Sequence, residues 1–516
     1  MLNQEKLFSE NEILRNEVQG LKLQVESHQD KIKHYESEVS RLYEMLLELK
    51  RMKFGTKSER WESSEQLVFN EVEIEFKKPE PSAKDDDEIK VGGYTKKRGG
   101  RKPLPLDLER EVIIIELPEA ERFTEDGMSL KIIGYEISEK LSYEPSKTKV
   151  IQYRRAKYGV NNGDYEKTAP PVPSIIPKGI ATPELVAAIT TQKYSYGLPL
   201  YRQEEMFAQM GVDLPRQTMA RWVVQSSEAC IPVYNILCDR LLEDFYVSCD
   251  ETPTQVLKEK GRAAESKSWM WVRCTPFGKN KIILFDYDPS RSGEVAKKLF
   301  TDFKGFLQVD GYAGYNTLEK NLEIMRIGCN MHGRRYFEQA KTIGAKSGQS
   351  LGEMGLRFYK QLYEFEEGWR SLPPEERHRL RQEKHVPVWD EFKAWVELNY
   401  KKVPPKSKIG KAFHYFLSEY EYLIGYLKDG RLEMDNGFAE RAIRKFAIGR
   451  NNWIFADTEA GANASAIFYS LICTAKINGV KPYEVMKYLF IELPKAKTLE
   501  DVERLADVIM GISPLP

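Results

Sequence analysis

The chain has 516 residues, of which 41% are hydrophobic and 30% are charged, so it is long enough for roughly three or four folded units. Its 78 basic and 78 acidic residues give a net charge of zero. Since nucleic-acid-binding proteins are usually basic, the total counts mildly against that class, and only local basic patches can argue for it. No run of about 18 apolar residues occurs and the first residues do not form a signal peptide, so we expect no membrane association.

Cysteines are scattered along the chain without any Cys-x-x-Cys pair, at Cys230, Cys238, Cys249, Cys274, Cys329 and Cys473. Structural zinc sites and disulfide frameworks use closely spaced cysteines, so this pattern argues against both kinds of site. It fits a reducing compartment, and we therefore expect a cytoplasmic protein.

Residues 1–50 carry an apolar seven-residue repeat. One series is mostly leucine, and the series four residues after it is mostly β-branched: Leu7, Leu14, Leu21, Leu42 and Leu49, then Val18, Val25, Ile32 and Val39. This combination favours a parallel two-stranded coiled coil, so we expect a homodimer joined through this segment. The alternative is one long amphipathic helix packed against its own protein.

Residues 51–110 are predicted to be a linker, because prolines, an acidic run and paired glycines cannot supply a core. The linker contains a basic, glycine-rich stretch that includes Arg98, Arg101 and Lys102. Such a stretch suits the minor groove of DNA, although a solvated basic tether has the same composition. Residues 111–183 predict a small β domain, from short β-branched runs separated by glycine and proline.

Residues 184–240 have helical periodicity. Two predicted helices, residues 199–210 and residues 216–223, flank a tight turn at Gly211. A helix, a turn with glycine and a second helix is the layout of a helix-turn-helix, but also of an ordinary αα-hairpin. As a helix-turn-helix, the segment would bring four polar side chains to DNA: Arg216, Gln217, Thr218 and Arg221.

Residues 245–252 predict a hydrophobic strand that ends at two adjacent carboxylates, Asp250 and Glu251. A second apolar strand ends at Asp310, 60 residues later (310 − 250). Residues 241–475 predict three strands, a helix and two further strands, which is the order of a ribonuclease-H-like sheet with its first and fourth strands adjacent. Asp250 and Asp310 would then converge on one cation, whereas either residue alone could be an ordinary surface turn residue.

Beyond a predicted helical insertion at residues 337–430, residues 435–444 predict the start of another helix, with Asp435 or Asn436 as its N-cap. Glu440 and Arg444 lie one turn apart on this helix. The pair is either a routine salt bridge or a third metal ligand beside a phosphate-binding arginine. Residues 476–516 predict a helical C-terminal region, so the whole chain is expected to be a multidomain α+β protein.

Three carboxylates, in a chain with neither a Cys-x-x-Cys pair nor a dense histidine cluster, suit Mg²⁺ or Mn²⁺ rather than Zn²⁺. Two such ions, about 3.5–4 Å apart, can clamp the attacking and leaving oxygens of a phosphodiester. Asp250, Asp310 and Glu440 are therefore the predicted catalytic residues and metal ligands. Two ions are expected, and no covalent enzyme intermediate is required.

Several motifs together resemble the IS66-family insertion-sequence transposases. They include Asp250-Glu-Thr-Pro-Thr-Gln-Val, Val309-Asp-Gly-Tyr, His332-Gly-Arg-Arg and Asp435-Asn-x-x-x-Glu-Arg-x-Ile-Arg444, and shorter matches extend over nearly the whole chain. The resemblance implies an Asp-Asp-Glu transposase with its acids at Asp250, Asp310 and Glu440. It also implies that the helix-turn-helix and the upstream domain bind the terminal inverted repeats of the element, as double-stranded DNA.

The chain departs from this family in one respect that concerns zinc. The family usually carries a small zinc-binding domain, with cysteine pairs expected near residues 123–127 and 159–163. This chain has neither Cys nor His in either place. We therefore expect a β unit that folds without metal or has degenerated, and no zinc.

Further DNA contacts are expected from basic side chains near the three acids: His332, Arg334, Arg335, Arg441, Arg444, Lys445 and Arg450. The protein would work in the cytoplasm on nucleoid DNA, with accessory proteins of the same element as further candidate partners. Two other functions fit the same residues. One is a coiled-coil, helix-turn-helix regulator without catalysis, and the other is a nuclease that cuts DNA but does not join it.

Overall fold

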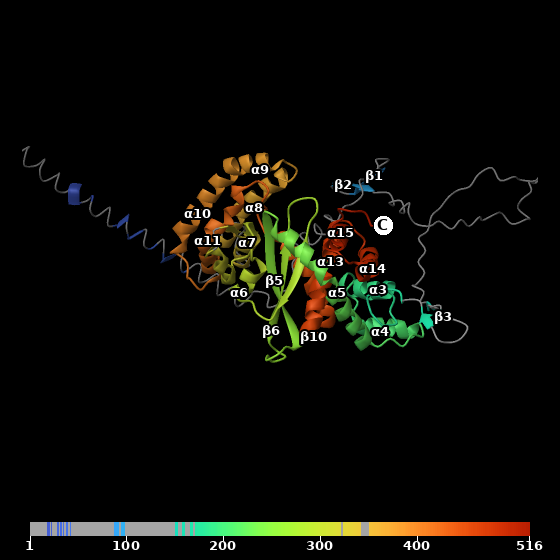
Figure 1. Ribbon diagram of the computed structural model, residues 1–516. Coiled ribbons are helices and arrows are strands. Elements are labelled where there is room, and N and C mark those ends of the chain that lie inside the picture. The colour runs from blue at the N-terminus through green and yellow to red at the C-terminus, as the bar shows by residue number, and fades with distance from the viewer. Residues whose placement is uncertain are drawn as a thin grey trace, which may run out of the picture. The chain divides into compact units, whose positions relative to one another are not determined.

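The computed structural model describes residues 171–515 except 321–322 and 342–349, together with short pieces before residue 171 (Figure 1). The chain divides into two compact units, residues 77–170 and the remainder. Of the predicted coiled coil, only scattered positions between residues 18 and 42 are described. These positions are helical, and five of their apolar side chains are at least half exposed: Val18, Ile32, Tyr35, Val39 and Leu42. Pairing with a second copy stays a prediction.

The smaller unit, residues 77–170, contains two short antiparallel hairpins. Strand β1 (Asp87–Val91) pairs with β2 (Tyr94–Arg98), and β3 (Lys157–Gly159) pairs with β4 (Glu166–Thr168). The first hairpin lies inside the predicted linker. Its strands are separated by two glycines in the sequence, a dipeptide typical of tight hairpin loops. The strands predicted between residues 111 and 149 lie outside the described residues.

A six-stranded mixed sheet forms the centre of the larger unit. Its main path runs β7-β6-β5-β8-β9, so the first and fourth strands along the chain are neighbours, as the sequence predicted. Pairs β7–β6 and β6–β5 are antiparallel, and pairs β5–β8 and β8–β9 are parallel. The bounds are β5 (Tyr246–Lys258), β6 (Lys267–Cys274), β7 (Ile283–Asp288), β8 (Gly305–Gln308), β9 (Ile324–Ile327) and β10 (Ala456–Thr458), with β10 pairing along the far end of β5.

Strand β5 is longer than the sequence predicted. It has 13 residues and continues to Lys258, so the prediction that the strand ends at the two acids was wrong. The parallel partner β8 leaves β5 at Ser248, but the antiparallel partner β6 remains paired up to Gln255. Asp250 therefore lies where one neighbouring strand stops and the other continues, which keeps its backbone fixed from one side.

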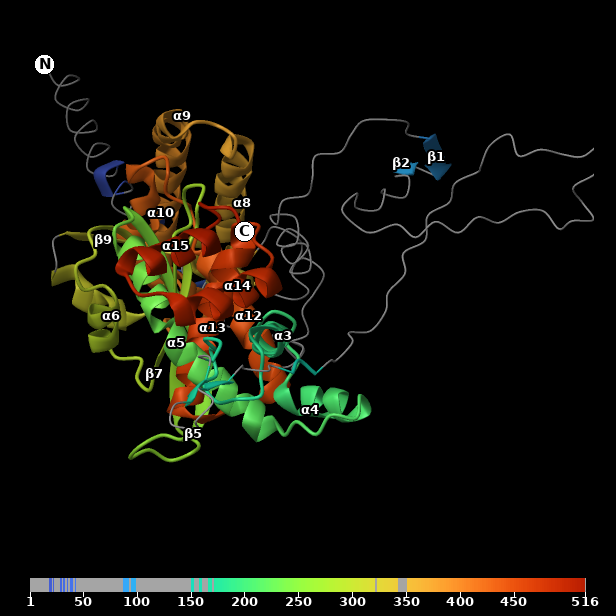
Figure 2. The ribbon, with the colours of Figure 1, turned by 45° about the vertical axis from the view of Figure 1, so that its right-hand side comes forward.

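The helix that opens with Arg216 also differs from its prediction. Instead of ending near residue 223, α5 (Arg216–Leu242) has 27 residues. Buried apolar residues continue at helical spacing along its second half, and the hydroxyl of Tyr234 donates to the carbonyl of Phe285 on β7 at 3.1 Å. Helices α3 (Pro183–Tyr194) and α4 (Leu200–Gln209) lie beside α5 (Figure 2). The predicted recognition helix is thus the exposed start of a core helix.

Two hydrophobic cores hold helices around the sheet. One joins the sheet to α5, α13 (Glu459–Ile477), α14 (Pro482–Glu492) and α15 (Leu499–Ile509). Hydroxyl groups of α13 cover the edge strand: Ser470 accepts from the backbone N–H of Phe285 at 2.7 Å, and Thr474 accepts from Ile283 at 3.0 Å. These bonds satisfy donors that an open sheet edge would expose. The C-terminal region is helical, as predicted.

The second core belongs to the predicted helical insertion, on the other side of the sheet in Figure 1. It is built mainly from α7 (Asn330–Gln339), α8 (Leu351–Trp369), α10 (Val386–Tyr400) and α11 (Lys408–Leu423), and α9 (Pro374–Leu380) follows α8 in the chain. The buried Arg381 donates to Glu366 at 2.7 Å and to the backbone carbonyl of Leu432 at 2.9 Å. This arginine ties the insertion to the segment that leads into α12 (Gly437–Trp453). No helix among the described residues is long and apolar enough to cross a membrane.

Candidate active site

The register of two parallel strands places Asp250 beside Asp310. Ser248 pairs with Gln308, and each aspartate lies two residues further along its chain (250 − 248 and 310 − 308). One oxygen of each carboxylate is tied to local backbone. Asp250 Oδ1 accepts the N–H of Glu251 at 2.9 Å, and Asp310 Oδ1 accepts the N–H of Tyr312 at 3.0 Å. The two carboxylates are thus held at one level of the sheet.

Glu440 is brought to the same region by the first turn of α12. The preceding Asn436 is only 1% exposed, and its side-chain amide donates to the carbonyl of Cys249 on β5 at 2.8 Å. The N-cap position is therefore Asn436, as one of the two predictions had it, but its side chain bonds to the sheet and makes no capping bond to its own helix. The start of α12 is fastened to the strand residue next to Asp250.

The surroundings of Asp250 disfavour its ionised form. Burial raises the pKa of Asp250 well above its ordinary value, and the negative charges of Glu251, Glu440 and Asp310 raise it further. Like charges at short range favour protonation of one partner. A bound cation removes this repulsion, so the arrangement suits a cation far better than it suits three free carboxylates.

Glu251, the second acid of the predicted strand end, has both carboxylate oxygens bonded to protein side chains. Its Oε1 accepts from Arg291 Nε at 2.7 Å, and its Oε2 accepts from the hydroxyl of Tyr315 at 2.5 Å. Burial raises the pKa of Glu251, whereas Tyr315 and Arg291 act in the opposite direction. With both oxygens occupied, Glu251 supports the site from within and leaves Asp250 as the available ligand on β5.

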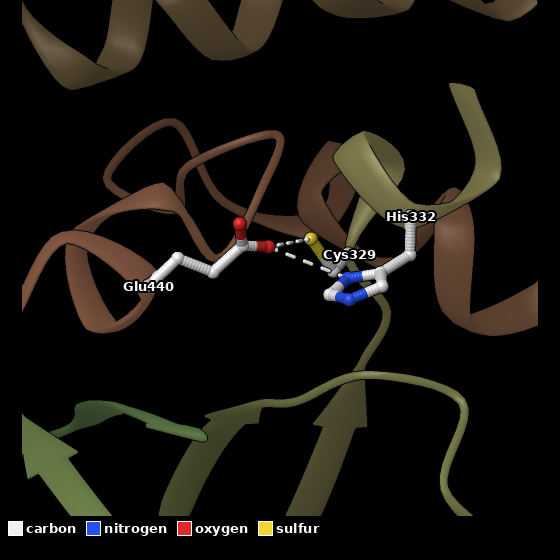
Figure 3. Close-up of side chains that lie close together, drawn as sticks. All are labelled: Cys329, His332 and Glu440. Carbon is white, nitrogen blue, oxygen red and sulfur yellow. Dashed lines mark hydrogen bonds and ion pairs between the residues drawn. The ribbon is translucent and has the colours of Figure 1, made fainter. Parts of the chain in front are cut away.

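The carboxylate of Glu440 is turned toward α7 in this structure (Figure 3). Its Oε1 lies 3.6 Å from Cys329 Sγ and 3.4 Å from His332 Nδ1, and its Oε2 lies 3.5 Å from Arg335. Across the described ranges, Cys329, His332 and Glu440 form the one group of three His, Cys, Asp or Glu residues whose ligand atoms all lie within 4.8 Å of one another. The three predicted acids do not form such a group.

A site for two ions does not require all three acids to meet at one point. With oxygens about 2.1 Å from each ion and ions about 3.5–4 Å apart, ligands of opposite ions can lie up to about 8 Å from each other. Asp250, Asp310 and Glu440 could therefore hold two ions without all three meeting at one point.

Predicted DNA-binding residues surround Glu440 on two helices. On α7, Arg334 and Arg335 are exposed and His332 is half-buried; on α12, Lys445 is exposed while Arg441 and Arg444 are half-buried. Arg450 instead joins α12 to β5, by donating to Thr252 Oγ1 at 3.3 Å and to the carbonyl of Pro253.

The other predicted DNA contacts belong to other segments of the chain. Arg216, Gln217 and Arg221 are exposed at the start of α5, and Thr218 is half-buried there. Arg98 ends strand β2 in the smaller unit. Arg101 and Lys102 lie outside the described residues.

Two site residues were missed in the sequence. Cys329 begins α7 as its N-cap residue and lies against Glu440, although cysteines had been examined only as pairs. The sequence signal that could have identified Cys329 is its spacing to His332, which follows three residues later at the start of the helix. The buried Arg326 donates to the backbone carbonyl of Asp310 at 3.1 Å and to Glu419 at 2.6 Å, which steadies the turn after β8. No sequence pattern indicated that contact.

Comparison with known proteins identifies related sequences over most of the chain. A family model described as "Transposase IS66 family" matches residues 178–464, and one described as "Transposase C of IS166 homeodomain" matches residues 41–113. Two similar proteins of Sinorhizobium fredii (strain NBRC 101917 / NGR234) are named as uncharacterized. Protein y4qI is 31% identical over 485 residues, which cover 90% of this chain and 88% of the relative. Protein y4hP is 30% identical over 409 residues, 76% of this chain and 74% of the relative.

Proposed function

Because the chain belongs to the IS66 family of transposases, we propose that it cuts and joins DNA at a metal-dependent site formed by Asp250, Asp310 and Glu440. The observation that supports this proposal is the register of β5 and β8, in which Ser248 pairs with Gln308, two residues before Asp250 and Asp310 respectively. Glu440 comes from α12, whose first turn is bonded to β5. The sheet order supports a ribonuclease-H-like catalytic domain.

The residues fit hard divalent cations such as Mg²⁺ or Mn²⁺. All three acids offer oxygen, and Asp250 is buried among like charges that raise its pKa. When bound, two ions would activate the attacking oxygen and neutralise the leaving oxygen of a phosphodiester. Asp250 and Asp310 would hold them from the sheet, and Glu440 would hold them from α12.

Basic side chains next to the acids would position the DNA. Arg334, Arg335 and Lys445 are exposed on the two helices that flank Glu440, where they can neutralise phosphates. Arg216, Gln217 and Arg221, at the exposed start of α5, would read the terminal inverted repeats. The N-terminal segment would join two copies, so that two element ends are held together.

Asp310→Asn tests the proposal. With Mg²⁺ and a duplex carrying the element's terminal repeat, cleavage should fall about 1000-fold or more, because losing a metal ligand removes several kcal/mol of transition-state stabilisation. Asp302→Asn is the matched control, since Asp302 is exposed in a turn at φ 68°, a conformation that asparagine tolerates. Unchanged cleavage by Asp310→Asn would contradict the catalytic role and favour a DNA-binding regulator. If the parent protein cuts DNA but gives no joined product with a supplied target duplex, the result would favour a nuclease.

A further inference from the structure

A second set of metal-binding atoms meets beside the proposed catalytic acids (Figure 3). Glu440 Oε1 is 3.6 Å from Cys329 Sγ and 3.4 Å from His332 Nδ1. A tetrahedral zinc ion, with bonds of about 2.3 Å to sulfur and about 2.0 Å to nitrogen and oxygen, separates sulfur from oxygen by about 3.5 Å and nitrogen from oxygen by about 3.3 Å. The observed spacings already match those of a zinc coordination shell to within roughly a few tenths of an ångström.

Two further features of the cluster favour a soft transition metal. Nδ1 of His332 is enclosed by protein and makes no hydrogen bond, although it lies at ion-pair distance from Glu440. Cys329 is the N-cap residue of α7, and its sulfur accepts the backbone N–H of Asn436 at 3.3 Å. The sulfur therefore lies at the start of α7 with its position fixed by the backbone that leads into α12. A donor set of sulfur, nitrogen and oxygen suits zinc or cobalt and is poor for Mg²⁺.

We propose that Cys329, His332 and Glu440 bind a single Zn²⁺-class ion, at a site separate from the two Mg²⁺ positions but sharing Glu440 with them. Binding replaces the thiol proton of Cys329, which is released to solvent, and forms one sulfur–metal bond. This site was not expected from the sequence, where the absence of cysteine pairs predicted no zinc. The consequence for catalysis rests on the proposed function: zinc holds Glu440 against α7 and so competes with its use as a Mg²⁺ ligand.

Cobalt titration of the metal-free full chain tests the site directly. Co²⁺ should produce the near-ultraviolet absorption band of a thiolate–cobalt bond, and added Zn²⁺ should abolish the band by displacement. Cys329→Ser should lose the band, whereas Cys230→Ser, at an equally buried cysteine on α5, should keep it. A parent protein without the band, or a Cys329→Ser variant that retains it, would overturn the proposal.

His332→Gln provides a second variant for which misfolding is a lesser concern, since this side chain is 21% exposed. It should weaken zinc binding at least about tenfold. Unaltered zinc affinity in a folded His332→Gln protein would contradict the assigned ligand set. In Mg²⁺-dependent cleavage, Cys329→Ser should need more zinc than the parent for the same fractional inhibition.

The metal site and the proposed function can fail separately. If the cobalt band depends on Cys329 while Asp310→Asn still cleaves normally, the zinc-class site stands and the catalytic assignment falls. If Asp310→Asn is inactive and no Cys329-dependent band appears, the catalytic assignment stands and the zinc-class site falls.

Discussion

Two buried carboxylates, Glu366 and Asp250, have opposite surroundings. Burial alone raises the pKa of Glu366, but hydrogen bonds and charge from Arg381 outweigh it, so the pKa is lowered. At Asp250, burial raises the pKa and the neighbouring acids Glu251, Glu440 and Asp310 raise it further. The protein neutralises the first carboxylate with its own arginine and leaves the second among like charges. The first carboxylate therefore stabilises the fold, and the second is the one that we propose as a cation ligand.

The largest expected effect is on DNA cleavage at the proposed site of Asp250, Asp310 and Glu440. Glu440→Gln should reduce Mg²⁺-dependent cleavage about 1000-fold or more, because a neutral amide is a poor ligand and removes several kcal/mol from the transition state. Glu338→Gln on α7, at an exposed glutamate paired with Lys341, is the control and should cleave normally. Gel analysis of end cleavage measures both. Full activity of Glu440→Gln would exclude this residue from the site.

At Glu366, which is paired with Arg381, we expect an effect on the free energy of unfolding. Glu366→Gln leaves Arg381, whose side chain is fully buried, without its counter-charge. Breaking one side of a buried pair costs about 3–5 kcal/mol. Urea unfolding should show that loss, and Glu376→Gln, in an exposed pair with Arg379, should show little change. Equal effects of the two substitutions would contradict the distinction drawn between buried and exposed pairs.

Asp250→Asn should abolish cleavage yet stabilise the metal-free protein, since it removes a buried charge from among like charges. With EDTA at pH 7, the midpoint of thermal unfolding should rise by about 2 °C, which corresponds to about 1.5 kcal/mol for a unit of more than 300 residues. The folded parent binds a proton at Asp250 more tightly than the unfolded chain does. The parent therefore loses stability relative to the variant as the pH rises above 3.8, the ordinary pKa of the group.

The same comparison gives a test with metal. Added Mg²⁺ should raise the unfolding midpoint of the parent, because the ion binds the folded state. Added Mg²⁺ should raise the unfolding midpoint of the Asp250→Asn variant much less. A midpoint that falls in Asp250→Asn without metal, or an equal Mg²⁺ response in both proteins, would show that repulsion among the acids is not what the site relieves.

The smallest expected effect concerns DNA contacts remote from the acids. Arg221→Ala, at the exposed start of α5, should weaken binding to the terminal repeat and reduce the salt dependence of log Kd by about one unit of slope. Arg202→Ala, exposed on α4, is the matched control. Fluorescence anisotropy over a range of salt concentrations measures both. Identical slopes of log Kd against log salt concentration for the parent and Arg221→Ala would show that Arg221 does not contact DNA phosphates.

Much of this arrangement could be predicted from local patterns. The sheet order followed from the strand signals, and so did the pairing of the two strands that lead to Asp250 and Asp310. The length of β5 could not be predicted, because it depends on pairing with β6. Likewise, nothing local indicated that Cys329 would meet Glu440, since that contact arises from the packing of α7 against α12. The length of β5 and the contact between Cys329 and Glu440 both depend on residues that are distant in the sequence.

The central claim is that Asp250, Asp310 and Glu440 act as one metal site. Anomalous diffraction from crystals of the protein soaked with Mn²⁺ and bound to a terminal-repeat duplex tests it most directly. We expect two manganese peaks about 3.5–4 Å apart, with Asp250 and Asp310 among the ligands and a Glu440 oxygen within about 2.0–2.6 Å of one peak. Manganese peaks that Glu440 does not reach, with its carboxylate still on Cys329 and His332 in the DNA complex, would contradict it.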